Sequence, residues 1–140
     1  MPISGADSVD RLVLDTSGYS HLRTGHVQTL AQIARASVVL VPVVVIGELE
    51  AAFESGSRAK ANRDELAQFL AEPYVVTADV TMGVARRYGK VFALLRRNGT
   101  PISINDVWIA ATTLEADGHL LTFDQDFKHV PGLRATVLTP

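Results

Sequence analysis

The sequence predicts an α/β domain in which a parallel sheet is covered by helices on both faces. Short runs of consecutive apolar residues alternate along the chain with longer segments whose apolar residues recur every three or four positions. The first pattern is typical of strands buried on both faces, and the second is typical of helices that pack on them. The chain has 140 residues without an internal repeat or a linker, which fits a single domain.

The strands are predicted from the apolar runs, which are short and bounded by polar or turn-forming residues. Because strands and helical segments alternate, the connections between strands are crossovers and the sheet is expected to be parallel. The predicted strands span residues 12–14, 38–41, 74–76, 119–122 and 135–138.

The helices are predicted from apolar periodicity and from residues that favour helix ends. Asp79 and Asn105 are good N-caps, because a short side-chain oxygen can accept a hydrogen bond from a free backbone N–H. Gly99 and Gly118 follow the last apolar positions of two segments, where glycine commonly ends a helix. The predicted helices span about residues 16–22, 27–34, 43–53, 63–70, 80–98 and 106–117.

The segment 43–53 is ambiguous because its β-branched residues would also suit a strand. Pro42 decides the assignment. Proline has no backbone N–H for a central strand, whereas its fixed φ suits the first turn of a helix. We therefore predict that residues 43–53 are helical.

Composition excludes several classes of function. The chain has no cysteine, which rules out cysteine-ligated zinc, thiol catalysis and a disulfide framework, and fits a reducing cytoplasm. The small, polar segment 1–11 is interpreted as a flexible leader without a secretory signal, and the longest apolar stretch, 38–47, is too short to span a membrane. The net charge is -2, so any nucleic-acid site must be a local basic patch.

Four acidic residues stand next to apolar segments that should be core: Asp15, Glu48, Asp106 and Asp124. Asp15 ends the first strand, Asp124 follows the fourth, and the other two lie near helix starts, so all four can converge on the carboxyl edge of the sheet. Carboxylates gathered in this way repel one another unless a cation holds them. A ligand set made only of oxygen selects hard cations, so the sequence predicts a Mg²⁺ or Mn²⁺ site.

Each acid, taken alone, also has an ordinary structural explanation. Asp15, Asp106 and Asp124 all suit helix caps, first helical turns or loop turns, and Glu48 could face solvent. Asp126 is better explained as a turn residue than as a direct ligand. The four histidines show no ligand spacing and are interpreted as structural or surface residues. Only the combination of four acids favours a metal site.

These motifs, in this order, resemble those of the PIN-domain ribonucleases, and most closely the VapC-like toxins of bacterial toxin–antitoxin pairs. The resemblance covers nearly the whole chain after residue 11. It rests on the segments 12–17, 45–49, 99–111 and 122–133, of which the third is the most specific.

The resemblance implies a five-stranded parallel sheet in a three-layer α/β/α sandwich, spanning residues 12–140. It also implies Mg²⁺- or Mn²⁺-dependent cleavage of RNA, a homodimer and a cognate antitoxin that blocks the site. Asp15, Glu48, Asp106 and Asp124 match the family's acidic cluster, with Thr16 or Thr122 as polar support. Asp126 matches a less uniform position, so its role stays open.

Contacts with RNA would need local positive charge. The loop group Arg58, Lys60 and Arg63 is the candidate, because phosphate contacts need basic residues near the acidic edge. A second basic group lies within residues 86–97 and is interpreted as a solvated helix face.

The sequence leaves two alternatives open. A phosphatase of the haloacid dehalogenase type also has an aspartate after its first strand, but its Asp-x-Asp pattern is broken here by Ser17. A non-catalytic PIN-like binding or dimerisation module is the other alternative, and a nuclease assay would distinguish it from an enzyme.

Overall fold

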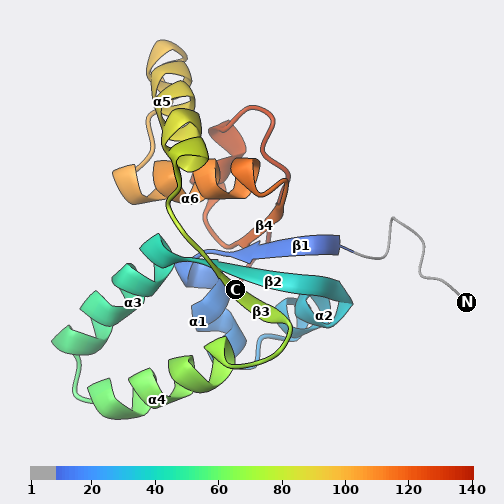
Figure 1. Ribbon diagram of the computed structural model, residues 1–140, viewed down its shortest axis with the longest axis vertical. Helices are drawn as coiled ribbons and strands as arrows, with labels where there is room; N and C mark the ends of the chain where they lie inside the picture. The colour runs from blue at the N-terminus through green and yellow to red at the C-terminus, as the bar shows by residue number, and fades with distance from the viewer. Residues whose placement is uncertain (1–8) are drawn as a thin grey trace, which may run out of the picture.

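The computed structural model describes residues 9–140, which form one five-stranded sheet with helices on both faces (Figure 1). All neighbouring strands are parallel, and their order across the sheet is β3-β2-β1-β4-β5. The strands are β1 (Val9–Leu14), β2 (Ala36–Pro42), β3 (Val75–Ala78), β4 (His119–Thr122) and β5 (Ala135–Val137). The predicted α/β/α sandwich with a five-stranded parallel sheet is therefore confirmed.

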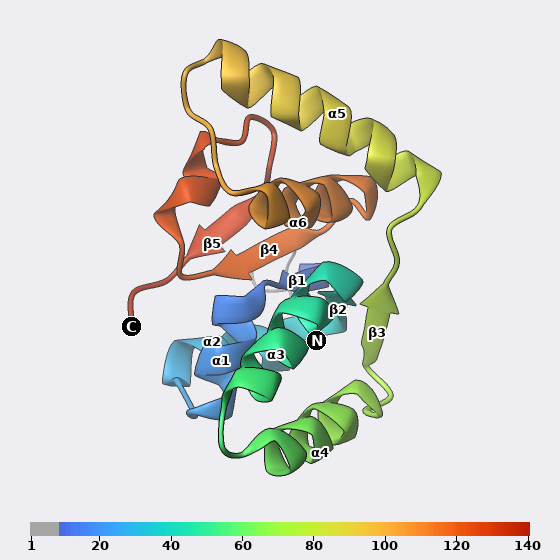
Figure 2. The same cartoon turned by 90° about the vertical axis from the view of Figure 1, so that its left-hand side faces the viewer.

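The helices divide between the two faces of the sheet, as right-handed crossovers in opposite directions from β1 require. Figures 1 and 2 show α5 and α6 on one side and α1 to α4 on the other, with α5 packed along α6. The helices are α1 (Thr16–Arg23), α2 (Val27–Arg35), α3 (Val43–Ser55), α4 (Ala59–Leu70), α5 (Met82–Arg97), α6 (Ile104–Glu115) and the short 3-10 helix η1 (Gln125–His129). In residues 9–140, no helix is both long and apolar enough to cross a membrane.

The centre of the core is strand β1. Leu12, Val13 and Leu14 are completely buried, and the apolar residues of β2 and β4 pack beside them. Burying each such side chain contributes roughly 1.5–3 kcal/mol. This packing holds the carboxyl ends of β1 and β4 side by side, because Leu14 pairs with Leu121.

Pro42 lies where the prediction placed it, at the junction of β2 and α3. It is the last residue of β2, where its Cα pairs with Ala78, and it is also the N-cap of α3. From Val43 the chain is helical, and Val45, Leu49 and Phe53 bury one face at four-residue spacing. The predicted helix 43–53 is confirmed.

The predicted leader 1–11 needs a correction at its end. Residues 1–8 lie outside the described part of the chain, but residues 9–11 belong to β1. Val9 pairs with Ala36 and Arg11 with Val38, so backbone pairing continues beyond the apolar run. The prediction missed these residues because Asp10 and Arg11 are polar and exposed.

Two helix caps were also assigned two residues away from their positions, the cap of α5 too early and the cap of α6 too late. Thr81, not Asp79, caps α5 through its bond from the N–H of Val84, and Ser103, not Asn105, caps α6 through its bond from the N–H of Asp106. In both cases a serine or threonine competes with a nearby Asp or Asn, and such residues rank almost equally as caps. The shift in α6 leaves the Asn105 side chain free for another contact.

Candidate active site

The candidate site lies at the carboxyl ends of β1 and β4, the adjacent central strands. Strands β2 and β3 lie on one side of β1 in the sheet, whereas β4 and β5 lie on its other side, so the strand order reverses between β1 and β4. Such a reversal of strand order opens a crevice between the following loops, where ligands bind in parallel sheets. Asp15 directly follows β1, and Asp124 lies two residues after β4.

Asp15 is almost completely buried, with 4% of its surface exposed. Its carboxylate caps α1 by accepting a hydrogen bond from the N–H of Gly18 at 2.7 Å, and it accepts another from Ser17 Oγ at 2.8 Å. Burial raises the pKa of Asp15 above its ordinary value, the hydrogen bonds from Thr122, Gly18 and Ser17 lower it, and the charge of Asp124 raises it again. The site therefore holds a carboxylate that is fixed but costly to ionise.

Thr122, the last residue of β4, joins Asp15 to Asp124. Its Oγ1 donates to Asp15 Oδ2 at 2.5 Å and accepts from the N–H of Asp124 at 3.0 Å. Ser17 Oγ makes a parallel link, because it also accepts from the N–H of Phe123 at 3.0 Å. The loop after β4 is thus bonded directly to the start of α1.

Glu48 lies in the second turn of α3 and is held from two other elements. Thr16 Oγ1 donates to Glu48 Oε1 at 2.7 Å, and Asn105 Nδ2 lies 3.4 Å from Glu48 Oε2. The two contacts connect Glu48 to the starts of α1 and α6. Glu48 therefore faces the site rather than open solvent.

Asp106 lies in the first turn of α6 and is half-buried, and its environment shows that the four acids are neighbours. Its pKa is raised to about 6, chiefly by burial, against the lowering effect of the Ser103 hydroxyl and with further contributions from the charges of Asp124, Glu48 and Asp15. The structure thus brings together all four acids that the sequence singled out.

The donor set fits a hard divalent cation. The potential ligands that the four acids and their neighbours Thr16, Ser17, Thr122 and Asn105 offer are oxygen atoms, and burial together with the charges of the other three acids raises the pKa of Asp106. Within residues 9–140, no three acidic or histidine side chains are close enough to form a complete ligand set on their own. Mg²⁺ commonly binds one or two carboxylates and keeps several waters, which suits this spacing.

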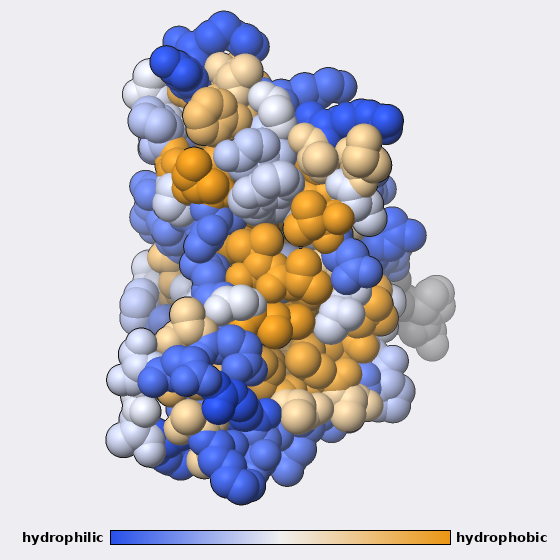
Figure 3. Space-filling model, turned by 60° about the vertical axis from the view of Figure 1, so that its left-hand side comes forward, coloured by the Kyte–Doolittle hydropathy of each residue, from blue (hydrophilic) through white to orange (hydrophobic). Residues whose placement is uncertain are grey.

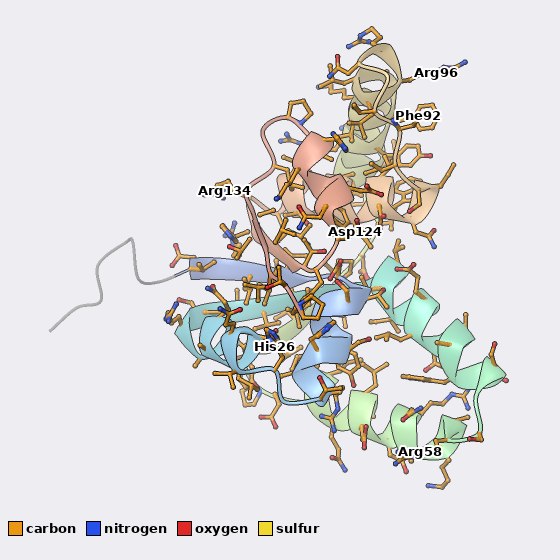
Figure 4. All side chains as sticks on the ribbon, turned by 180° about the vertical axis from the view of Figure 1, so that it is seen from behind. His26, Arg58, Phe92, Arg96, Asp124 and Arg134 are labelled. Carbon is orange, nitrogen blue, oxygen red and sulfur yellow. The ribbon has the colours of Figure 1, made fainter. Side chains whose placement is uncertain are left out.

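The remaining residues singled out from sequence lie further from the centre. The Asp126 N–H donates to Asp124 Oδ1 at 2.9 Å, and its own side chain is exposed. Lys60 pairs with Asp64, and Arg63 pairs with Glu50 and Glu54 of α3. Figure 4 shows Arg58 at the outer end of α4, well away from Asp124. The RNA contacts predicted at Arg58, Lys60 and Arg63 stay a prediction. The charges of Lys60 and Arg63 are already paired with acidic side chains of the protein.

Ser17, Gly18 and Asn105 support the site in ways that their sequence positions do not reveal. A Cβ at Gly18 would lie 2.8 Å from the carbonyl oxygen of Leu121, so only glycine lets α1 approach β4 this closely. His21, interpreted as a structural or surface residue, has a structural contact, because its ring stacks on Phe123 at 3.7 Å between ring centroids, next to Asp124 in the sequence. These contacts join segments that are far apart in the sequence, so no local pattern could have predicted them.

Residues 12–133 match the PIN domain family, and the chain therefore belongs to that family. This match covers every residue of the acidic site. A comparison with curated proteins finds no match. Membership of the PIN family leaves no place for the haloacid dehalogenase alternative, and Ser17, at the position where that chemistry needs a second carboxylate, hydrogen-bonds to Asp15 instead.

Solved structures of VapBC proteins share this fold. VapBC2 from Rickettsia felis, bound to a DNA fragment from its promoter, has a TM-score of 0.80 at 20% identity, covering 91% of this chain and 98% of that chain. VapBC-5 from Mycobacterium tuberculosis has a TM-score of 0.71 at 24% identity, covering 93% and 98%. Mycobacterium tuberculosis VapC20, described as a sarcin–ricin loop cleaving toxin, has a TM-score of 0.66 at 20% identity, covering 92% and 99%. At these identities the similarity establishes the fold.

Proposed function

We propose that this protein is a Mg²⁺- or Mn²⁺-dependent ribonuclease and the toxin of a toxin–antitoxin pair. The observation that carries the proposal is the convergence of four acids at the reversal of strand order: Asp15, Glu48, Asp106 and Asp124. Their negative charges act on one another, so the charges of the other three raise the pKa of Asp106 and the charge of Asp124 raises the pKa of Asp15. Structural proteins rarely keep such a costly cluster without a ligand, because uncompensated half-buried charges are destabilising.

Asp15, Asp106 and Asp124 are assigned as ligands of the cation, directly or through water, and Glu48 completes the site or orients a water. A bound cation of this kind lowers the pKa of a coordinated water and neutralises charge on a phosphodiester. Thr122 and Ser17 keep Asp15 and Asp124 in register, and Thr16 and Asn105 aim Glu48 at the same region. The protein thereby supplies a fixed, water-accessible oxygen site in which an RNA phosphate can react.

The choice of RNA and of the toxin role rests on the PIN family and on its VapBC structural neighbours, one of which is described as cleaving the sarcin–ricin loop. The test of the nuclease activity is a cleavage assay on total cellular RNA with Mg²⁺, with EDTA, and with Mg²⁺ restored. We expect cleavage that EDTA stops and Mg²⁺ restores. RNA that stays intact under all three conditions would favour the non-catalytic binding module instead.

Two apolar surfaces support partners of the kind present in VapBC complexes. Val27 and Leu30 of α2 are strongly exposed, and we assign this surface to the antitoxin. Figure 3 shows a second apolar area in the middle of one face, at the level where α3 and β3 lie in Figure 2, and Val76 of the edge strand β3 is exposed. We assign this second surface to a second copy of the chain, in a homodimer.

The toxin role predicts growth arrest when the wild-type protein is produced without an antitoxin. The Asp15→Asn variant should be produced freely from the same vector, because it keeps the fold but loses a cation ligand. Equal growth of cells producing either protein would argue against a toxin.

Val27→Asp should reduce antitoxin binding, and Val76→Asp should shift the sedimentation coefficient from the value of a dimer to that of a monomer.

A further inference from the structure

Helix α5 carries an unusual concentration of positive charge. It contains five basic residues and no acidic one: Arg86, Arg87, Lys90, Arg96 and Arg97. Within the described residues 9–140, Arg87 is the only member of this group in an ion pair, with Glu115 of α6. The other four are exposed. A solvated helix face usually mixes both signs of charge, so this composition indicates an anionic ligand.

An apolar pocket of about 310 Å³ opens beside these charges, between α5, the connection to α6 and the first turn of α6. Phe92 and Arg96 lie one helical turn apart, so they share a face of α5, and Figure 4 shows both projecting from the same side. Phe92 is 39% exposed, which is high for a phenylalanine. The pocket is lined by Phe92, Leu95, Arg96, Pro101, Ile102 and Val107.

A row of aromatic rings connects this pocket to the helix that carries Asp106. Trp108 of α6 stacks on Tyr88 of α5 at 3.9 Å between ring centroids, and Tyr88 lies 5.9 Å from Phe92 in a near-parallel arrangement. Phe92 is the most exposed of the three and ends the row.

The pocket is also close to the acidic site along the chain. Its wall residue Val107 directly follows Asp106, and Ile102 directly precedes Ser103, whose hydroxyl accepts from the Asp106 N–H. The first turn of α6 therefore contributes to both the pocket, through Val107, and the acidic cluster, through Asp106. A polymer bound at the acids would reach Phe92 along this turn of α6.

We propose that this pocket is a nucleobase-binding subsite for single-stranded RNA, in which a base stacks on Phe92 and Arg96 binds a flanking phosphate. Single-stranded RNA is bound in this way, by aromatic side chains that stack on bases and by basic residues that follow the backbone. The exposed Arg86, Lys90 and Arg97 form an adjacent row on α5 that extends the phosphate path. The proposal rests on the proposed ribonuclease function, because it assigns the substrate's position relative to the acidic cluster.

The test is the affinity of the full-length protein for labelled oligouridine and oligoadenosine, measured by fluorescence anisotropy in EDTA, where cleavage is absent. Phe92→Leu keeps an apolar side chain but removes the ring, and should weaken binding about five- to tenfold without changing the salt dependence. Phe92→Tyr keeps the ring and should bind like the wild type. Arg96→Gln should lower the slope of log affinity against log salt by about 0.7, the value for one phosphate contact on a single strand.

Arg35→Gln is the matched control, because it makes the same charge change at an exposed position of α2, on the other side of the sheet. It should leave affinity and slope unchanged. Equal binding by Phe92→Leu, Phe92→Tyr and the wild type would overturn the subsite, as would an Arg96→Gln slope equal to that of Arg35→Gln. Loss of a protein partner by Phe92→Leu with unchanged RNA affinity would also overturn it and assign the pocket to that partner.

Cleavage assays with Mg²⁺ separate this inference from the proposed function. If the wild type cleaves RNA, Phe92→Leu should raise KM and leave kcat nearly unchanged. Binding through Phe92 without any cleavage by the wild type would refute the nuclease function and leave the subsite standing. Cleavage by Phe92→Leu with the wild-type KM would refute the subsite and leave the nuclease function standing.

Discussion

Thr122 and Asp15 form the closest link between the two central strands at the site, with 2.5 Å between Thr122 Oγ1 and Asp15 Oδ2. Both residues are buried, and the same hydroxyl accepts from the N–H of Asp124. One threonine therefore sets the position of two acids. Because the hydroxyl donates to Asp15, its remaining acceptor capacity is available to the backbone of the β4 loop.

Thr122→Val should destabilise the protein and reduce cleavage. The substitution keeps the shape of the side chain but leaves the buried Asp15 oxygen and the Asp124 N–H without this partner, at a cost of about 1–3 kcal/mol. Thr113→Val is the matched control, because Thr113 is also buried but its hydroxyl only donates to the Ile109 carbonyl within α6. Urea denaturation of both variants checks this, and equal midpoints would contradict the role given to Thr122.

Gly18→Ala should open the contact between α1 and β4. The new Cβ would lie 2.8 Å from the Leu121 carbonyl oxygen, so a backbone shift is required, at a cost of roughly 1–3 kcal/mol. Gly89→Ala is the control, since Gly89 lies in α5 with nothing within 4 Å of an added Cβ, and it should stabilise the helix by roughly 0.5–1 kcal/mol. Melting temperatures that move in the same direction would show that the close approach at Gly18 is unimportant.

The fold could be predicted largely because its decisive features are local. A continuous apolar run reports a strand buried on both faces, and Pro42 excludes a strand at the start of α3 by its own geometry. The four acids could be found because a charge beside a core segment is costly wherever the segment lies. The order of the strands then places two of these acids together.

What could not be predicted depends on contacts between distant segments. Asn105 had a satisfactory local role as a cap, and only the assembled fold shows that its side chain lies beside Glu48 and that Ser17 Oγ accepts from the N–H of Phe123. Arg63 looked free for RNA in sequence, but the turn between α3 and α4 brings it to Glu50 and Glu54. Side-chain partners of this kind are set by tertiary packing, which leaves no periodic pattern in the sequence.

The raised pKa of Asp106 predicts an unusual pH dependence in metal-free buffer. Its pKa rises from 3.8 to about 6 in the folded protein, so folding favours the protonated form. The preference for protonated Asp106 therefore stabilises the folded protein fully below pH ~4, and this stabilisation is lost as the pH rises towards ~6. Solvent screening limits its contribution to the free energy of unfolding to about 1 kcal/mol. The melting temperature of the wild type in EDTA should therefore fall over this range relative to Asp106→Asn. If the melting temperatures of the two proteins changed with pH in parallel, the pKa of Asp106 would not be raised in the folded protein.

Asp15→Asn should distinguish the destabilisation that the acidic site causes in the absence of metal from the role of the site in binding a cation. Asn still accepts the N–H of Gly18 and caps α1, but it removes a buried carboxylate whose pKa is raised by burial and by Asp124. In EDTA the variant should melt at the same temperature as the wild type or higher, because one repelling charge is gone. Mg²⁺ should then raise the melting temperature of the wild type more than that of the variant, since binding to the folded state stabilises it in proportion to affinity.

The same pair of proteins tests the chemistry. We expect Asp15→Asn to lose RNA cleavage at every Mg²⁺ concentration, while Asp79→Asn, an exposed acid on the connection between β3 and α5, cleaves like the wild type. The contrast matters because general loss of negative charge would favour RNA binding in both variants alike. If Asp15→Asn cleaved RNA at the wild-type rate, or if the wild type were fully active in EDTA, the acidic cluster would not be the site of a cation-dependent reaction.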